Sequence, residues 1–469
     1  MLFNSFKFLL VFPLIFGIHW VIPAKYNQCR KLFLILVSYL LYMNFKPAFS
    51  LVLIGVTLIT YWGGYLFDYK QGVDRKKHLI WLFVLIGLLP LLIFKYYNFI
   101  NENIVDGLSA IGLRFSLPGL NWAVPVGISF FTFQAVGYML DVYHGRIKAE
   151  KNIIDYVLFV SFFPQIASGP ISKADELMPQ IKKERTFDYG QAVSGLKYLL
   201  WGMFLKVVLA DRAGIYVDTV FGAYEKFSGA GCVLASVLYS IQIYADFAGY
   251  SLMAVGIGKT LGFDLINNFR RPYFAASVTE FWKRWHISLT RWLTQQVYIP
   301  LGRSRCSKAK TYWNIMVTFL VSGIWHGANW TFIVWGGLHG VFQIVEKALG
   351  WNKKESKGFV KMLRILATFV VVTLAWVVFR SSSIGDAVGL MSRYFTNEGQ
   401  SIADIPTLAY ISIAIIPLLL LEFGKEVFPT IYERLRDVTI IRWAAYLSLF
   451  AMIVLIGVHD GSSFIYVSF

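Results

Sequence analysis

Long apolar runs separated by short polar segments make up most of the chain. Residues 82–94 (LFVLIGLLPLLIF) and 366–379 (LATFVVVTLAWVVF) are two such runs. A helix needs about 20 mostly apolar residues to cross the hydrocarbon core of a bilayer. By that measure the pattern predicts an all-α, polytopic membrane protein with about eleven transmembrane helices. The shorter apolar stretches at 32–45 and 312–325 are expected to be tilted, re-entrant or broken.

Composition and charge agree with a protein that faces lipid. Charged residues are 15% of the chain, whereas soluble proteins carry about 25%. The formal net charge is +17, but the basic residues gather between the apolar runs, at 25–31, 70–78, 303–310 and 353–361. The positive-inside rule explains this placement better than nucleic-acid binding does. Membrane lipid is therefore an expected partner and nucleic acid is not.

The middle of the chain, residues 120–350, interrupts its apolar runs with polar segments. These segments are FFPQIASGPIS (162–172), YADFAGYS (244–251), NNFRRPYF (267–274) and WHGANW (325–330). Irregular backbone at membrane depth is tolerated only where protein buries it or a wet cavity adjoins it. We therefore expect one transmembrane domain, 1–469, with a core at 120–350 that surrounds a cavity. N-terminal helices (1–119) and C-terminal helices (351–469) are expected to pack around this core.

Segment 277–300 has a different pattern, typical of a helix lying along the membrane surface. Trp282, Trp285 and Leu289 share one helical face, and Lys283 lies off that face. Aromatic residues beside basic ones are typical of interfacial helices. Ser277 or Thr279 is the expected N-cap.

His326 is the leading candidate for chemistry among the seven histidines, because it lies within the apolar segment 323–330. Ionisable residues in membrane segments usually face a cavity, the bundle interior or a partner. A neutral imidazole there could take a proton from a hydroxyl or thiol that attacks an acyl carbonyl. Trp325 and Trp330 could shield it from lipid. A histidine that only ties two helices together by a hydrogen bond fits the same pattern.

Other ionisable residues have weaker signals. His286 fits a headgroup boundary, and His339 fits packing or support of His326. Asp246 is an acid in an apolar run, for which an ion pair is a better explanation than a polar path. Arg270 and Arg271 could bind an anionic group, such as a phosphate or a pantetheine carrier, or could anchor the chain at the interface.

Several kinds of site find no support in the sequence. Neither the histidines nor the three cysteines, Cys29, Cys232 and Cys306, have metal-site spacing. The phosphate-binding glycine loop, the G-x-S-x-G elbow and the H-E-x-x-H zinc helix are also missing from the sequence. We expect neither a metal nor a bound cofactor.

Several segments together resemble the membrane-bound O-acyltransferase family, in its bacterial polysaccharide-modifying branch for alginate, peptidoglycan, cellulose and teichoic acid. The main ones are DFAGYSLMAVGIGKTLGF (246–263), NFRRPYFAASVTEFWKRWHISLTRWL (268–293), YIPLG (298–302) and SGIWHGANWTFIVWGGLHG (322–340). The resemblance covers most of the chain. It implies a multi-helix fold around a tunnel, with His326 of the WHG motif as the essential catalytic residue. It assigns His286 as a second functional position.

The resemblance also implies a reaction. Its members take an acyl group, here expected to be acetyl, from a cytoplasmic thioester, either acetyl-CoA or an acyl carrier protein. They pass it across the bacterial inner membrane for O-acylation of an exported polysaccharide such as alginate, often through an SGNH-type partner. Residues expected along the substrate tunnel are Trp325, Asn329, Asp246, Trp285 and Arg270.

Other functions stay open at this point. The same reaction on peptidoglycan, cellulose or teichoic acid (D-alanyl) is one, and acylation of a lipid or a protein is another. A glycan exporter is a third, although transporters tend to show paired polar interruptions in two related halves, which this sequence lacks. The segment 294–296 (TQQ), Ser304 and the ending FIYVSF depart from the family pattern. These departures weaken the inference of one particular polysaccharide.

Overall fold

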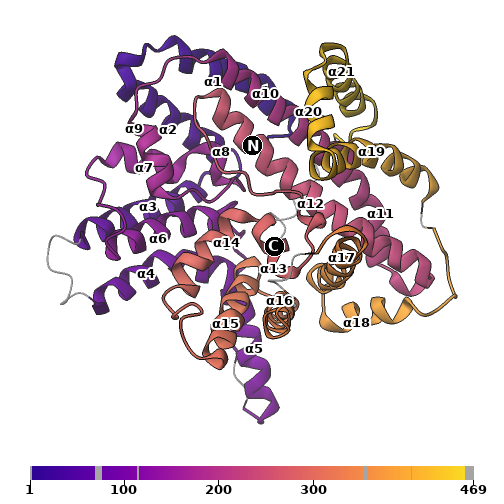
Figure 1. Cartoon of the computed structure of the whole chain (residues 1–469). Helices are drawn as coiled ribbons and strands as arrows, with labels where there is room; N and C mark the ends of the chain where they lie inside the picture. The colour runs from indigo at the N-terminus through magenta and orange to yellow at the C-terminus, as the bar shows by residue number, and fades with distance from the viewer. Residues whose placement is uncertain (1–2, 69–76, 114–115, 352–355, 403, 460–469) are drawn as a thin grey trace. The chain divides into compact units, whose positions relative to one another are not determined.

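The computed structural model describes residues 3–68, 77–113, 116–351, 356–402 and 404–459 (Figure 1). The regular elements of these residues are helices, and one isolated β-bridge joins Phe227 and Gln400. The prediction of an all-α protein is therefore confirmed. The chain forms two compact units, which are described separately. Unit 1 comprises Met1–Leu196 and Ala254–Ile266, and unit 2 comprises Lys197–Met253 and Asn267–Ser468. The domain boundaries expected at residues 119 and 350 stay predictions.

Unit 1 contains the N-terminal helices. They are α1 (Phe6–Val21), α2 (Asn27–Met43), α3 (Phe49–Leu66), α4 (Lys77–Leu91), α5 (Tyr97–Ala110), α6 (Ile128–Tyr143), α7 (Ile153–Ser161), α8 (Phe163–Ile166) and α9 (Ala174–Lys182). Buried charges in this unit have ion-pair or hydrogen-bond partners, as the cost of charge in an apolar interior requires; Arg30, for example, donates to the Ile22 and Arg185 carbonyls. The Lys31 ammonium on α2 lies 2.6 Å from the Asp155 carboxylate on α7, and both side chains are buried.

Unit 2 contains most of the remaining helices. They are α11 (Asp211–Phe221), α13 (Val278–Arg284), α14 (Ile287–Leu293), α15 (Lys308–His326), α16 (Trp330–Ala348), α17 (Gly358–Arg380), α18 (Ile384–Arg393), α19 (Ile405–Val427), α20 (Pro429–Asp437) and α21 (Thr439–Ile456). Two further helices, α10 (Tyr189–Met203) and α12 (Gly229–Thr260), have residues in both units.

Short non-α turns complete the helical structure. Three π-helical turns, η4 (Leu92–Tyr96), η5 (Phe204–Ala210) and η8 (Thr294–Tyr298), continue from α4, α10 and α14. The 3₁₀ turns among the described residues are η1 (Ala24–Tyr26), η6 (Tyr224–Lys226) and η7 (Pro272–Phe274).

Seven helical segments among the described residues are long and apolar enough to cross a membrane. They are 49–66, 78–110, 189–221, 229–260, 358–380, 405–427 and 439–456. An eighth would be the pair Phe6–Val21 and Ala24–Met43, which is bent by 107°. The chain is thus a multi-pass membrane protein, and the expected count of eleven spans is not confirmed. The bend before α2 agrees with the expectation that stretch 32–45 belongs to a broken element.

The single helix expected over 277–300 is instead two short helices followed by a π-helical turn. Ser277, one of the two expected caps, is the N-cap of α13. The Ser277 hydroxyl accepts a hydrogen bond from the Glu280 N–H at 3.0 Å. The helix stops at Arg284, and α14 begins at Ile287 after a left-handed residue, His286. The face with Trp282 and Leu289 is buried in unit 2 and packs against protein. The prediction of one continuous helix was wrong, and its place at the membrane surface stays a prediction.

Candidate active site

His326 lies at the end of α15 and is enclosed by aromatic rings. Its imidazole centroid is 4.9 Å from that of Trp325, 5.0 Å from that of Trp335 on α16 and 5.2 Å from that of Phe379 on α17. Only 2% of the residue is exposed. The imidazole is therefore shielded from bulk water by three helices of the same unit.

The residues that follow His326 explain why the helix ends there. Gly327 is extended, and a Cβ at this position would lie 2.1 Å from the Phe332 ring. Asn329 then caps α16, because its Oδ1 accepts a hydrogen bond from the Thr331 N–H at 3.0 Å. Trp330, expected to shield the histidine, begins α16 with 52% of its surface exposed. The break after His326 is therefore specified by its immediate neighbours.

Helices α15 and α16 form a close antiparallel hairpin that fixes the position of His326. A Cβ on Gly323 would lie 2.3 Å from the Phe332 carbonyl oxygen, and one on Gly336 would lie 2.4 Å from the Phe319 carbonyl oxygen. Small residues let the backbones of membrane helices approach closely. The two glycines therefore set how near the end of α15 comes to α16.

His286 is fully buried at the break between α13 and α14. Its backbone is left-handed (φ 40°, ψ 54°), a conformation that costs a non-glycine residue about 1–3 kcal/mol and that gathers at functional sites. Its ring lies 4.6 Å from that of Phe247 on α12. Burial lowers the pKa of His286 from 6.5 to about 3, so its imidazole is neutral near pH 7.

Trp325 brings the two histidines into one cluster. Its indole centroid is 4.9 Å from the imidazole of His326 and 5.5 Å from that of His286. The two histidines belong to separate segments of the chain, and both are buried. The two catalytic residues predicted from the sequence therefore contact the same aromatic side chain.

His339 on α16 supports this cluster. Its Nδ1 accepts a hydrogen bond from the indole N–H of Trp282 at 3.2 Å, and its ring lies 4.9 Å from that of Trp335. Trp335 is the same residue that contacts His326. The contacts agree with the packing role expected for His339.

Asp246 on α12 forms a buried ion pair. Its carboxylate lies 2.6 Å from the Lys206 ammonium, which is also 2.7 Å from the Asp211 carboxylate. All three side chains are buried. The ion-pair interpretation of Asp246 is confirmed, and its place along a tunnel stays a prediction.

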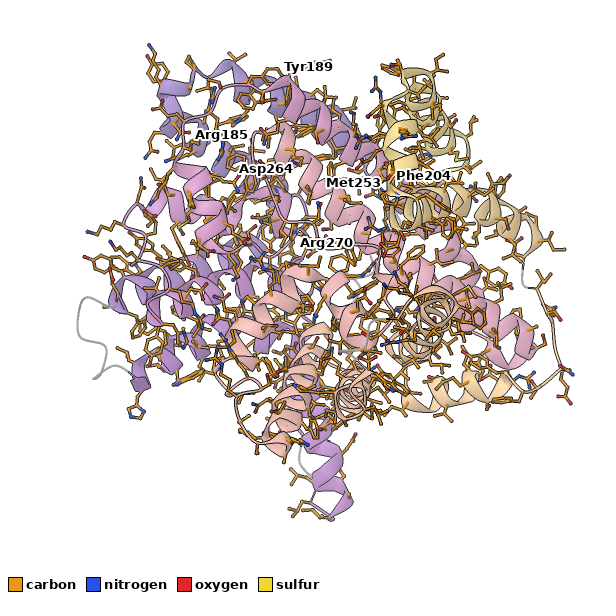
Figure 2. All side chains as sticks on the ribbon, in the orientation of Figure 1. Arg185, Tyr189, Phe204, Met253, Asp264 and Arg270 are labelled. Atoms are coloured by element: carbon orange, nitrogen blue, oxygen red, sulfur yellow. The ribbon has the colours of Figure 1, made fainter. Side chains whose placement is uncertain are left out.

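Trp285 and Arg270, two further predicted tunnel residues, differ in their surroundings. Trp285 is fully buried, with its ring 5.4 Å from Phe281 and 5.0 Å from Trp376. Arg270 is exposed, and its backbone N–H donates to the Arg284 carbonyl at 2.9 Å (Figure 2). Asn329 is partly buried, and its amide donates to the Ser382 carbonyl at 3.0 Å. The contacts show Trp285 as a packing residue, and tunnel lining stays a prediction for all three.

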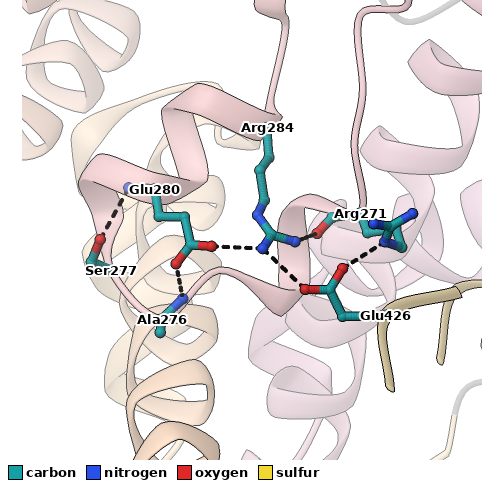
Figure 3. Close-up of polar contacts among 6 residues, drawn as sticks. All are labelled: Arg271, Ala276, Ser277, Glu280, Arg284 and Glu426. Carbon is teal, nitrogen blue, oxygen red and sulfur yellow. Dashed lines mark hydrogen bonds and ion pairs between the residues drawn. The ribbon is translucent and has the colours of Figure 1, made fainter. Parts of the chain in front are cut away.

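Two carboxylates that the sequence analysis missed hold the segment before His286. The first, Glu426 near the end of α19, pairs with Arg271 at 2.6 Å and with Arg284 at 3.0 Å (Figure 3). Arg284 also pairs with Glu280 at 2.6 Å. This network ties both flanks of α13 to α19.

Glu346 is the second missed carboxylate. It accepts hydrogen bonds from the backbone N–H groups of Val278 and Thr279, at 2.5 and 2.9 Å, and from the Thr279 hydroxyl at 2.9 Å. Glu346 thus caps the start of α13 from the last turn of α16. An acid at a helix C-terminus is unfavourable for its own helix, and that signal could have revealed an outside partner.

Comparisons with known proteins show the family to which the chain belongs. Residues 146–384, which include both histidines and Trp325, match the family model MBOAT, membrane-bound O-acyltransferase family. A probable alginate O-acetylase AlgI of Pseudomonas syringae pv. tomato is 37% identical, over 84% of this chain and 75% of that protein. One from Azotobacter vinelandii is 35% identical, over 90% and 83%. A peptidoglycan O-acetyltransferase of Helicobacter pylori is 33% identical, over 86% and 82%.

Proposed function

We propose a specific reaction for this chain, which belongs to the membrane-bound O-acyltransferase family and is thus an O-acyltransferase. It supplies acetyl groups for an exported polysaccharide, and alginate is the favoured acceptor. The donor is a cytoplasmic thioester, acetyl-CoA or an acyl carrier protein, and the protein itself binds no cofactor. The acyl group crosses the bacterial inner membrane, where an SGNH-type partner passes it to the glycan. The names of the relatives at 35–37% identity support this acceptor.

His326 is the general base in this proposal. As a hydroxyl or thiol attacks the acyl carbonyl, its proton passes to the imidazole. The bond between the carbonyl carbon and the thioester sulfur then breaks, and the proton moves on to the leaving thiolate. A general base of this kind contributes about 10²–10⁴-fold to the rate. His286 assists by positioning the reacting groups.

One observation carries the proposal. Two buried histidines, each at a helix break, contact the same indole ring inside the segment that matches the family. A histidine that only joined helices would need no second histidine at the same aromatic side chain. The enclosed position also excludes water, which would otherwise hydrolyse the thioester.

The test compares His326→Gln, His286→Asn and His144→Gln in the full-length protein. His144 is an exposed histidine after α6 and serves as the matched control. The measurements are the membrane level of each variant and the acetyl ester content of the exported glycan. We expect a loss of about 100-fold or more for His326→Gln at normal membrane level, and no loss for His144→Gln. Unchanged acetylation in a normally inserted His326→Gln variant would overturn the proposal.

The same experiment separates the alternative functions. Esters on peptidoglycan instead of alginate would change the acceptor and keep the reaction. Glycan export that needs this protein but continues in the double histidine variant, with no ester in any variant, would identify an exporter. Consumption of the thioester without any acylated glycan would support the proposed partner, provided that acylated glycan forms once an SGNH-type protein is added.

A further inference from the structure

The backbone around His286 is held by one residue from another segment, Asn268. The Ile287 N–H donates to the Asn268 carbonyl at 3.0 Å, and the Ser288 N–H donates to the Asn268 side-chain oxygen at 3.0 Å. These are the first two N–H groups of α14, which a helix cannot satisfy from within. Asn268 therefore caps α14 in place of the residue that occupies the N-cap position.

That N-cap position is held by His286, whose side chain makes no capping hydrogen bond. An N-cap residue ordinarily folds its side chain back onto the N–H groups of its own helix. Since Asn268 supplies the acceptors, the imidazole can point elsewhere, toward Phe247 and Trp325. Asn268 thus fixes the backbone at the start of α14, and the His286 side chain is not needed for capping.

Asn268 is itself fixed in place. It is 1% exposed, and its amide nitrogen donates to the Ser251 hydroxyl on α12 at 3.2 Å. With the nitrogen on Ser251, the amide oxygen faces the start of α14. Its neighbour Asn267 is only partly buried and instead donates to the Tyr198 hydroxyl at 3.4 Å. The two asparagines therefore offer a matched pair with and without contact to α14.

We propose that Asn268 is a positioning residue that holds His286 in its left-handed conformation and aims its imidazole at Trp325. The inference rests on the proposed function of His286 in acyl transfer. Replacement of the Asn268 side chain leaves the backbone carbonyl that accepts from the Ile287 N–H, but it removes the acceptor of the Ser288 N–H. The left-handed turn then loses part of its support, and the imidazole moves. A displacement of about 1 Å at a catalytic group can cost on the order of 100-fold in rate.

The test uses the full-length protein in membranes with four variants: Asn268→Leu, Asn268→Asp, Asn267→Leu and His286→Asn. The measurements are kcat and KM for the acyl donor, and the pH dependence of kcat. For Asn268→Leu we expect kcat to fall by about 10–100-fold, with KM within about threefold. Asn267→Leu should keep the wild-type kcat. A loss of the same size in both leucine variants would overturn the inference.

Asn268→Asp distinguishes positioning from a general effect on folding. Its carboxylate can still accept from α14, and the start of a helix favours negative charge. We expect it to restore most of the kcat that the leucine variant loses. Its charge should also move the acidic limb of the pH profile upward, because a nearby anion favours the imidazolium. An inactive aspartate variant, or an unmoved profile, would contradict the proposal.

Failure of this inference differs from failure of the proposed function. If His286→Asn keeps the wild-type kcat, the proposed role of His286 is wrong. If His286→Asn loses activity while Asn268→Leu keeps the wild-type kcat, only the positioning role is wrong. Should the leucine variant not reach the membrane, the pH profile of the aspartate variant still decides between the two.

Discussion

Gly336 and Gly337 are adjacent on α16, but their surroundings are opposite. A Cβ on Gly336 would lie 2.4 Å from the Phe319 carbonyl oxygen and 3.2 Å from the backbone of Gly323. On Gly337 the nearest atom would be a flexible Leu320 methyl at 3.8 Å, an ordinary contact. We therefore predict that the same substitution, glycine to alanine, is harmful at Gly336 and tolerated at Gly337.

The magnitudes follow from two terms. Alanine improves helix propensity by up to about 1 kcal/mol at either position. At Gly336 the added methyl group meets backbone atoms, which cannot rotate away, and overpacking of this kind costs about 1–3 kcal/mol. Gly336→Ala must also push α15 away from α16, and His326 lies at the end of α15. We expect Gly336→Ala to lower both stability and activity, and Gly337→Ala to preserve both.

The effect on stability is measured by heating the purified variants in detergent and determining the fraction that stays monodisperse. Acetyl transfer in membranes at equal protein level measures the effect on activity. Equal Tm and equal activity in the two variants would refute the reasoning. So would a lower Tm for Gly337→Ala than for Gly336→Ala, because the close approach would then not lie where the structure places it.

Three further predictions concern His286 and its support. Asparagine tolerates left-handed backbone better than alanine, so His286→Asn should be more stable than His286→Ala by about 1 kcal/mol, and equal Tm values would contradict the strain. Burial lowers the pKa of His286 to about 3, so below pH 6.5 the unfolded chain binds a proton there that the folded chain does not. Stability should therefore fall from pH 6.5 toward pH 3, by up to about 1.4 kcal/mol per pH unit from this residue. The pH dependence of Tm should be shallower in His286→Asn, and parallel curves would disprove this. Glu346→Ala leaves the Val278 and Thr279 N–H groups without their acceptor and should lower the free energy of unfolding by about 2 kcal/mol. The Tm of Glu346→Gln should lie between those of Glu346→Ala and the wild type, and any other order would count against the cap.

Local signals in the sequence predicted local features well. Apolar runs predicted an all-helical multi-pass protein, because lipid-exposed backbone must satisfy its own hydrogen bonds. Ser277 was one of two expected caps, Ser277 or Thr279, from its position before an apolar helix. Asp246 was expected to have a basic partner, because an isolated charge in an apolar interior is costly. Each of these inferences needed only neighbouring residues and a general energetic rule.

The error over 277–300 has a specific cause. Tryptophans and leucine at helical spacing predicted one continuous helix, and nothing within that segment marks His286 as left-handed. The acceptors that fix the two short helices lie outside the segment: Asn268 caps α14 after the turn, and Glu346 caps the start of α13. Hydrophobic periodicity predicts a helix whose backbone hydrogen bonds are internal, and it contains no information on hydrogen-bond acceptors from distant segments.

The sequence by itself determined that this chain is a helical membrane protein, and its motifs singled out His286 and His326. Only the tertiary structure decided that both imidazoles contact Trp325, and which side chains hold them there. The physical reason is the range of the forces involved. Burial in lipid and helix formation depend on nearby residues, whereas the direction of a buried imidazole depends on contacts between distant segments.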